Sequence, residues 1–357
     1  MSEAVSLDRY RILGRSGLRV SPLSLGTMTF GTEWGWGADK EEARQIFDLY
    51  VERGGNFIDT ANLYTNGTSE QFLGAFARGM RDHLVIATKY TLATNAGDPN
   101  SGGNHRKCMV QSVEMSLRRL MTDYIDLLYV HAWDSTTPAD EVLRAMDDLV
   151  RSGKVLYLGI SNTPAWQISR MQAIADLRGW APLIGLQIEY NLVERTPERD
   201  LIPMALEMGL GVIPWAPLAS GLLAGKYSKT DLGSPDTARV SVGSRKDGLI
   251  ARGVLSERSL AIVDTVKGIA SDIERSPSQV ALAWLVLNST ITSSIVGART
   301  LRQLHENLGA LDVQLTDVQQ AKLSEASSIQ LGFPHDHLAW LATTHFISRG
   351  SAALKRS

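Results

Sequence analysis

The chain has 357 residues, of which 44% are hydrophobic and 21% are charged, with a formal net charge of -2 and a pI near 6.4. These are the values of an ordinary globular protein, and they argue against a nucleic-acid-binding protein and against a disordered acidic tail. The first ten residues carry charges without an apolar core, and no apolar run approaches the roughly 20 residues that span a bilayer. We therefore expect a cytoplasmic protein with no membrane partner.

The chain opens with a predicted β-hairpin. Residues 9–20, RYRILGRSGLRV, form two short alternating stretches around a turn that contains Gly14 and Gly17. A first core strand, LSLG, is expected next at residues 23–26. A helix should then begin at Asp39 and run to Tyr50, because apolar residues recur there at helical spacing.

Short, almost wholly apolar segments then alternate with amphipathic ones. The second strand should end at Asp59, and the later strands are expected at residues 84–88, 124–130, 155–160, 183–188, 211–214 and 293–297. The helices are expected at residues 70–77, 110–120, 139–150, 165–176, 201–207, 260–273, 278–287 and 301–308. Apolar strands that alternate with helices indicate parallel strands covered by helices.

Eight such units favour a closed (β/α)8 TIM barrel over an open, doubly wound α/β sheet. A barrel of this kind occupies about 250 residues. The remainder is assigned to the hairpin, which we place at the barrel floor, to a long loop after the seventh strand (residues 228–259) and to a C-terminal extension. No linker divides the sequence, so we expect one barrel domain, residues 1–327, followed by a tail, residues 328–357.

In a TIM barrel the active site lies at the carboxyl ends of the strands. Polar or aromatic residues stand at most of these ends: Asp59, Lys89, His131, Ser161, Asn162, Gln187, Trp215 and the segment from Gly297 to Arg299. Tyr64 follows Asp59 by five positions, beyond a polar turn. Each residue has a structural alternative, such as a helix cap, a solvated cation, a core imidazole or simple packing. Their convergence on one rim favours a site.

An Asp, a Tyr, a Lys and a His together suit proton transfer. The ordinary pKa of tyrosine is about 10, too high for efficient acid catalysis at neutral pH. An ammonium about 4 Å away at an effective dielectric of about 20 favours tyrosinate by about 4 kcal/mol, or roughly three pKa units, although burial opposes this shift. We expect Lys89 to lower the pKa of Tyr64, Asp59 to hold Lys89, and His131 to bind a substrate oxygen.

Such an acid would protonate a developing alkoxide. Without a nucleophilic serine or cysteine, and without a metal cluster, an alkoxide suggests a carbonyl that receives hydride from a bound cofactor. The only cysteine, Cys108, has no catalytic context and excludes an internal disulfide. His335 and His337 lack the spacing and the companions of metal ligands, so no metal is expected. No G-x-G-x-x-G follows a strand, and GLLAGKY is not a P-loop.

Several motifs resemble the aldo-keto reductase family. The resemblance covers roughly residues 10–323, through YRILGRSGLRVSPLSLGTMTFG, NFIDTANLY, VIATKY, DLLYVHAWD, LGISN, LQIEYNL, PWAPLASGLLAGK and IVGARTLRQLHENLGAL. It implies a catalytic tetrad of Asp59, Tyr64, Lys89 and His131. It also implies a site for the nicotinamide carboxamide at Ser161, Asn162 and Gln187, with Trp215 stacked on the ring. Leu218, Ser220 and Lys226 match positions near the pyrophosphate, and Gly297, Arg299, Gln303, Glu306 and Asn307 match those at the adenosine end.

Two further expectations concern the cofactor and the substrate. Arg299 suits a 2'-phosphate, which predicts NADPH (NADP+) over NADH. Trp34, Trp36, Tyr90 and Trp133 should make the barrel mouth aromatic, which predicts a bulky or apolar carbonyl substrate. The complete tetrad favours an enzyme, an NADPH-dependent carbonyl reductase. The alternative function is that of an NADPH-binding regulatory subunit of the channel-associated type. The sequence departs from the family pattern at Ala219, Ser220 and Ala224, where many relatives have Gly or Thr. The oligomeric state, a homo-oligomer included, stays open.

Overall fold

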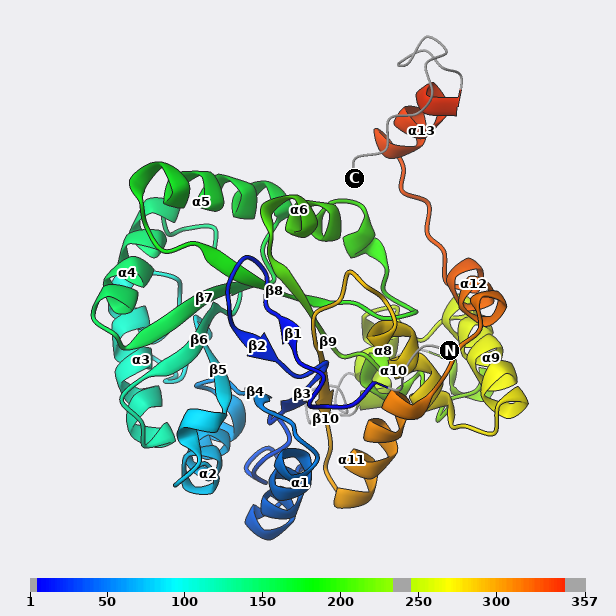
Figure 1. Ribbon diagram of the computed structural model, residues 1–357, viewed down its shortest axis with the longest axis horizontal. Coiled ribbons are helices and arrows are strands. Elements are labelled where there is room, and N and C mark those ends of the chain that lie inside the picture. The colour runs from blue at the N-terminus through cyan, green and yellow to red at the C-terminus, as the bar shows by residue number, and fades with distance from the viewer. Residues whose placement is uncertain (1–4, 234–244, 344–357) are drawn as a thin grey trace.

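Eight parallel strands enclose the centre of the molecule in a computed structural model that describes residues 5–233 and 245–343 (Figure 1). Their spatial order is β10-β3-β4-β5-β6-β7-β8-β9. The strands are β3 (Leu23–Gly26), β4 (Phe57–Asp59), β5 (Val85–Tyr90), β6 (Ile125–Val130), β7 (Val155–Ser161), β8 (Leu183–Glu189), β9 (Gly211–Trp215) and β10 (Ser294–Gly297). The ring closes where Val212 of β9 pairs with Ile291, just before β10, and Thr292 N donates to Val212 O at 2.9 Å.

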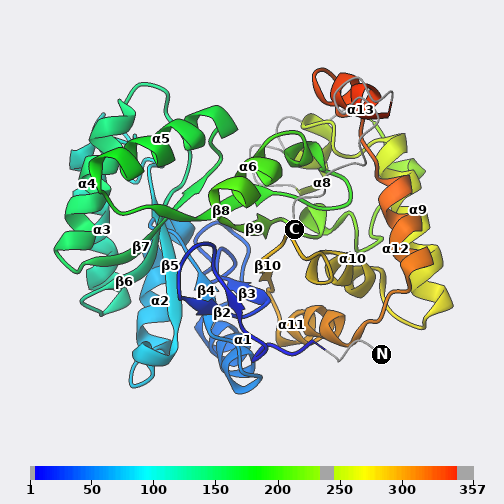
Figure 2. The ribbon, with the colours of Figure 1, turned by 45° about the horizontal axis from the view of Figure 1, so that its top comes forward.

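Helices surround the strands on the outside, as the two views show (Figures 1 and 2). They are α1 (Lys40–Glu52), α2 (Thr68–Phe76), α3 (Arg106–Leu120), α4 (Ala139–Arg151), α5 (Ala165–Arg178), α6 (Leu201–Met208), α8 (Arg245–Ala251), α9 (Glu257–Asp272), α10 (Pro277–Val286), α11 (Leu301–Leu308), α12 (Asp317–Ala326) and α13 (His335–Thr343). The (β/α)8 barrel is confirmed. None of the helices in the described ranges is both long and apolar enough to cross a membrane.

Most predicted elements lie within a few residues of the observed ones, and the largest differences occur at helix starts. The helix expected at residues 110–120 begins at Arg106, because His105 Nδ1 accepts a hydrogen bond from Cys108 N at 3.2 Å and caps it. The helix expected at residues 260–273 begins at Glu257, behind a Ser256 cap. Histidine is not among the common N-cap residues, which is why the first of these starts was missed.

Three helices have no counterpart in the predictions: α8, α12 and α13. α8 lies in the long loop predicted at residues 228–259, of which residues 234–244 lie outside the described ranges. α13 lies in the predicted tail and stands away from the barrel (Figure 1), while residues 344–357 again lie outside the described ranges. The assignment of residues 1–327 to one domain and 328–357 to a tail stays a prediction.

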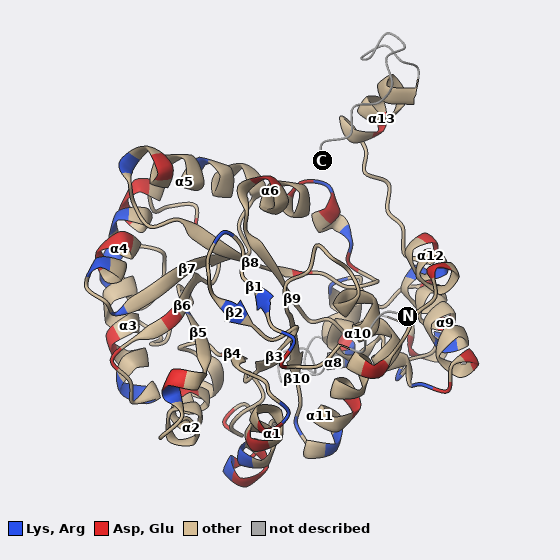
Figure 3. Ribbon diagram, in the orientation of Figure 1, with Lys and Arg blue, Asp and Glu red and all other residues tan. Residues whose placement is uncertain are grey.

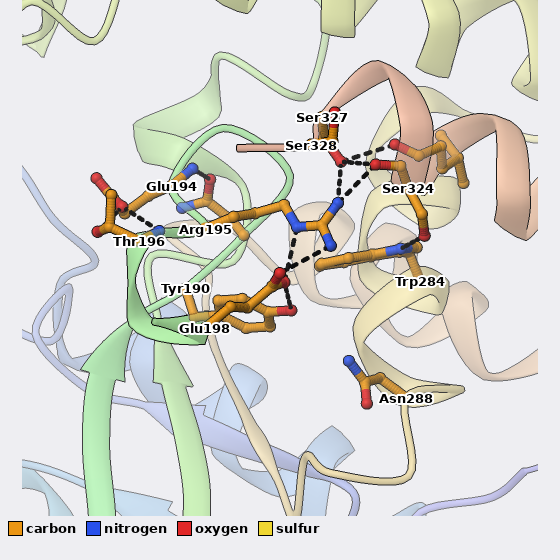
Figure 4. A network of polar contacts seen from close by, with 12 residues as sticks. Tyr190, Glu194, Arg195, Thr196, Glu198, Trp284, Asn288, Ser324, Ser327 and Ser328 are labelled. Atoms are coloured by element: carbon orange, nitrogen blue, oxygen red, sulfur yellow. Dashed lines mark hydrogen bonds and ion pairs between the residues drawn. The ribbon is translucent and has the colours of Figure 1, made fainter. Parts of the chain in front are cut away.

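Arg195 anchors α12 to the loop after β8 (Figure 4). Its guanidinium pairs with the Glu198 carboxylate, with Nε and Oε1 2.7 Å apart, and donates to Ser324 O at 2.7 Å and Ser327 Oγ at 2.9 Å. The same guanidinium lies 5.4 Å from the centre of the Trp284 ring on α10. One half-buried cation therefore joins the β8 loop, α10 and α12.

The predicted hairpin is confirmed and contributes to the barrel core. β1 (Arg11–Ile12) pairs antiparallel with β2 (Arg19–Val20). Leu13 and Val20 are fully buried in one apolar cluster with the inward residues of the strands, such as Phe57 and Ile213. Arg15 N donates to Gly209 O, just before β9, at 2.7 Å. This places the hairpin at the amino ends of the strands and leaves their carboxyl ends open to ligands.

A tyrosine fills the barrel interior. Tyr129 of β6 points inward, and a Cβ atom added to Gly159 of β7 would lie only 2.4 Å from its Cε1 atom. Only glycine leaves room for this ring. The interior is therefore a packed core, and polar chemistry is confined to the layer above it.

Most Lys, Arg, Asp and Glu residues lie on the outer helices and loops (Figure 3). One ion pair between the outer helices α2 and α3 is buried. Arg119 Nε lies 2.7 Å from Glu70 Oε2, and the side chains are 15% and 0% exposed, respectively. Thr88 Oγ1 donates to the other Glu70 oxygen at 2.6 Å. Removing the cation from such a buried pair leaves an uncompensated charge in the interior, which is strongly destabilising.

We expect Arg119→Met to lower the free energy of unfolding by about 3 to 5 kcal/mol, because it leaves the Glu70 carboxylate buried without its cation. Urea unfolding measures the change. The matched control is Asp176→Asn, which breaks the exposed Arg15–Asp176 pair, whose side chains are 40% and 53% exposed. The control should change stability by less than about 1 kcal/mol. Similar effects of the two substitutions would show that the Glu70 pair is not the stabilising contact inferred here.

Candidate active site

Strand alternation brings three of the expected catalytic residues into one layer. Successive side chains of a strand point to opposite sides, so Val85, Ala87 and Lys89 of β5 face the barrel axis. By the same alternation Asp59 of β4 and His131, directly after β6, also face inward. All three stand at the carboxyl ends of adjacent strands.

Lys89 is the centre of this layer. Its Nζ atom donates to Asp59 Oδ2 at 2.6 Å, to Thr60 O at 2.8 Å and to Tyr64 OH at 3.2 Å. The side chains of Lys89 and Asp59 are 0% and 4% exposed. Three acceptors use the three ammonium protons, so the buried cation is fully hydrogen-bonded.

Asp59 is held from its other side as well. Gln187 of β8 donates through Nε2 to Asp59 Oδ1 at 2.8 Å, while Oδ2 accepts from Lys89. Gln187 was expected to hold a carboxamide, yet its amide nitrogen is used by the carboxylate. Its carbonyl oxygen is the atom left to accept a hydrogen bond from a ligand.

Two opposing effects set the proton affinities of Lys89 and Tyr64. Burial lowers the pKa of the Lys89 ammonium, but Asp59 and Tyr64 raise it by more, so the pKa lies above its usual value of 10.5. Burial raises the pKa of the Tyr64 hydroxyl, and Lys89 offsets this rise only in part. The expectation that Lys89 brings the pKa of Tyr64 below its ordinary value is therefore wrong. In this site Tyr64 holds its proton at neutral pH.

His131 lies across from Tyr64, with ring centres 6.1 Å apart and planes at 80°. Burial, together with the nearby Lys89 ammonium, lowers the pKa of the His131 imidazole to about 3. His131 is therefore neutral at physiological pH. Its Nδ1 atom has no hydrogen-bond partner among the described residues. A neutral imidazole here can exchange hydrogen bonds with a ligand oxygen but is a poor source of protons.

The turn that carries Tyr64 has an unusual backbone. Tyr64 begins a 3-10 helix, η1 (Tyr64–Gly67), in which Thr65 and Asn66 have φ values of 46° and 57°. Side chains other than glycine rarely adopt this left-handed region, and it concentrates at functional sites. The turn is held by Thr65 Oγ1, which donates to Phe30 O at 2.6 Å and accepts from Ser69 N at 3.1 Å.

Several residues that support the site were missed from the sequence. Ser69 Oγ donates to Thr27 O at 2.7 Å and lies 3.0 Å from Thr60 Oγ1, while Thr27 Oγ1 donates to Asp59 O at 3.0 Å. Arg119 donates to Asn62 O at 3.2 Å from the other side of the Tyr64 turn. No local pattern marks these contacts, because they join residues far apart in the chain.

The expected nicotinamide residues line the rim beside the tetrad. Ser161 Oγ and Trp215 Nε1 are buried polar atoms without a partner among the described residues. Asn162, with φ at 45°, donates through Nδ2 to His131 O at 2.9 Å. Because buried polar atoms normally have partners, the free Ser161 and Trp215 groups fit a polar ligand at this position.

The expected phosphate and adenosine residues occupy the loop after β9 and the segment after β10. Leu218 directly precedes the short 3-10 helix η4 (Ala219–Gly221), Ser220 lies within it with φ at 55°, and Lys226 is exposed beyond it. After β10, Gln303 Oε1 accepts from Arg299 N at 2.9 Å, and Asn307 Nδ2 donates to Gly297 O at 3.3 Å. The Gln279 side chain donates through Nε2 to the backbone oxygen of Glu306, whose own side chain is exposed.

The Arg299 side chain is half-buried, and within the described ranges no carboxylate forms an ion pair with it. The Arg299 guanidinium is thus available to an anionic ligand.

Three of the four expected aromatic residues lie half-buried at the barrel mouth: Trp34, Trp36 and Trp133. The rings of Trp34 and Tyr64 meet edge to face, with centres 6.4 Å apart, and Trp36 packs on Trp34 at 5.7 Å. Tyr90 is different. It follows Lys89 on β5 and so points outward, where it is 0% exposed and donates to Asn104 O at 3.2 Å. Its expected contact with substrate is wrong, because strand alternation places it in the core.

The described residues contain no cluster of three or more histidine, cysteine or acidic side chains able to hold a metal ion. Cys108 is a buried free thiol.

Comparison with known proteins agrees with this geometry. The sequence profile of the Aldo/keto reductase family matches residues 22–328. An aryl-alcohol dehydrogenase [NADP(+)] from Phanerodontia chrysosporium is 37% identical over 92% of this chain and 88% of its own length. A norsolorinic acid reductase from Aspergillus flavus is 36% identical over 93% of this chain and 84% of its own. The uncharacterized oxidoreductase YrpG from Bacillus subtilis is 37% identical over 86% of this chain and 92% of its own length.

The low pKa of His131 predicts an imidazole that stays neutral as the pH falls. The folded-state value of about 3 lies below the ordinary 6.5, so between these values only the unfolded chain binds this proton. The contribution of His131 to stability is therefore complete above about pH 6.5 and declines as the pH falls toward 3. NMR should show its ring signals, assigned with His131→Asn, unchanged from about pH 8 to about pH 5. A midpoint near 6.5 would contradict the shift.

Proposed function

Because the chain belongs to the aldo/keto reductase family, we propose that it is an NADPH-dependent oxidoreductase that reduces an aldehyde or a ketone to an alcohol, with Tyr64 as the general acid. One observation carries the proposal. A buried ammonium, Lys89, contacts both the Asp59 carboxylate at 2.6 Å and the Tyr64 hydroxyl at 3.2 Å, at the open end of the barrel.

The roles of the four side chains follow from their contacts. When bound, the reduced nicotinamide supplies a hydride to the carbonyl carbon. Tyr64 gives its hydroxyl proton to the oxygen as negative charge develops there. Lys89 favours the tyrosinate that remains, and Asp59 keeps the ammonium charged and in place. His131, neutral at about pH 7, orients the carbonyl oxygen by a hydrogen bond.

The rim residues fit a nicotinamide cofactor. Ser161 Oγ offers a hydroxyl and Gln187 a carbonyl oxygen to a carboxamide, and Trp215 offers an indole face to a flat ring. Asn162 joins this group through its contact with His131 O. Leu218, Ser220 and Lys226 are proposed to hold the pyrophosphate. Gly297, Arg299, Gln303, Glu306 and Asn307 are proposed to hold the adenosine end, with Arg299 on a 2'-phosphate.

The aromatic mouth supports a bulky or apolar carbonyl substrate, with an aromatic or alicyclic ring. Trp34 meets the Tyr64 ring edge to face, Trp36 packs on Trp34, and Trp133 follows His131 by two positions, so all three offer flat apolar surfaces to a ligand. Two of the relatives are named for an aryl alcohol and for norsolorinic acid, which is consistent with such a substrate. The alternative of a channel-associated regulatory subunit has no support from the relatives described above.

Tyr64→Phe removes the proton donor but keeps the ring against Trp34. General acids contribute typically 10² to 10⁴-fold, so turnover of an aryl aldehyde should fall by about that factor. Cofactor binding, followed by fluorescence titration, should be retained. The matched control is Tyr10→Phe, since the Tyr10 hydroxyl is exposed and donates only to Gly54 O. Near-normal turnover of Tyr64→Phe with an unaltered pH dependence would transfer the acid role to His131.

Arg299→Ala should narrow the preference for NADPH over NADH by raising the Michaelis constant for NADPH. A hydrogen bond to a charged group is worth about 1.5 to 3 kcal/mol, which corresponds to a rise of roughly 10- to 100-fold. The constant for NADH should stay nearly the same. Arg302→Ala, two residues further on and exposed, is the control. Equal efficiency of the wild-type enzyme with both cofactors would reject the assignment.

A further inference from the structure

A cavity of about 410 Å³ lies beside the Tyr64 turn. Its walls come from that turn, from the loop after β5 and from α3. None of Asp59, Tyr64, Lys89 and His131 lines it. Its size falls within the range of small-molecule sites, and its lining shares only Trp34 with the residues proposed for the cofactor and the substrate.

The inner end of this cavity is polar and buried. Asn62, Cys108 and Ser112 line it and are 2%, 2% and 7% exposed. Asn62 Nδ2 donates to Ser112 Oγ at 3.2 Å, whereas Asn62 Oδ1 has no hydrogen-bond partner among the described residues. A buried amide oxygen without a donor is unfavourable, so a ligand that brings an O–H group to Asn62 would satisfy it.

One wall of the cavity is apolar and includes a flat ring. Trp34, Leu63 and Met115 line it. Trp34 also meets the Tyr64 ring edge to face, and Leu63 directly precedes Tyr64. A planar ring is the shape that packs best against an indole face.

The charges around the cavity disfavour an anionic ligand. Arg119 lines the cavity, but Glu70 neutralises its guanidinium at 2.7 Å, and a second nitrogen donates to Asn62 O. The other charged side chain on the lining is Asp98, an acid at the exposed rim. No free cation thus remains on the lining to bind a carboxylate or a phosphate.

We propose that this cavity binds a neutral phenolic ring, whose hydroxyl donates to Asn62 Oδ1 and whose face packs against Trp34. The ring belongs either to a distal part of a large carbonyl substrate or to a separate phenol. In both cases its position against Trp34 and Leu63 connects it to the Tyr64 turn.

Cys108 provides the test, because it is the only cysteine of the chain and lines the inner end. Burial raises the pKa of its thiol, so the folded protein is treated with iodoacetamide at alkaline pH, and the modified peptide is measured by mass spectrometry. Saturating phenol should slow this alkylation several-fold. Anisole, which lacks the donor, and benzoate, which adds a charge, should not slow it.

Two variants locate the effect. Asn62→Leu should abolish protection by phenol, and Thr94→Val, which removes a hydroxyl from the exposed rim, should leave it intact. If Asn62→Leu fails to fold, the comparison of phenol with anisole on the wild-type protein still shows whether protection requires the phenol hydroxyl. Equal protection by the two, or no protection, would overturn the proposal. So would a folded protein whose Cys108 is never alkylated, because the cavity would then be closed to small molecules.

The two sources of the ring differ in kinetics. Phenol competes with the carbonyl substrate if the cavity holds part of that substrate, and it inhibits or activates without competition if the ring is a separate ligand. The labelling assay needs neither cofactor nor turnover. Its outcome is therefore independent of whether the chain proves to be a reductase.

Discussion

A charged ammonium at the centre of an apolar barrel is the constraint on which the site depends. A buried lysine keeps its proton only beside a carboxylate and enough acceptors. Lys89 has both, in Asp59 at 2.6 Å and Thr60 O at 2.8 Å. Asp59 in turn accepts from Gln187 at 2.8 Å, so β4, β5 and β8 all act on one cation. The parallel barrel makes this possible, because it brings the carboxyl ends of its strands to one rim.

A second set of contacts holds the Tyr64 hydroxyl against that cation. Tyr64 lies on a turn with left-handed residues, which persists only where the surroundings determine it. Thr65 ties the turn to Phe30 O, and the buried Glu70–Arg119 pair ties it to α3. The outer helices therefore do more than cover the strands. They fix the distance between an ammonium and a hydroxyl, which electrostatic tuning of a proton donor requires.

The parts of this arrangement that depend on local pattern were predictable from the sequence. Apolar strands, their polar ends and the eightfold repeat predicted the barrel, and the strand ends contained Asp59, Lys89 and His131. Tyr90 was misplaced because nearness to Lys89 was given more weight than the alternation of a strand. The sign of the pKa shift of Tyr64 was missed because it depends on burial, which a sequence does not specify. Contacts such as Gln187 to Asp59, 128 residues apart, have no local signal.

The Lys89 ammonium lowers the pKa of Tyr64 relative to a site without that cation. In the role proposed for Tyr64, oxidation of an alcohol requires the ionised tyrosine as the base, so the pH–rate profile of that reaction reports this pKa. We compare the profile of the wild-type enzyme with that of Lys89→Met, after circular dichroism has shown that the variant is folded. We expect a higher apparent pKa and a slower rate in Lys89→Met, because a cation is lost and Asp59 is left unpaired. An unchanged or lower pKa would contradict it.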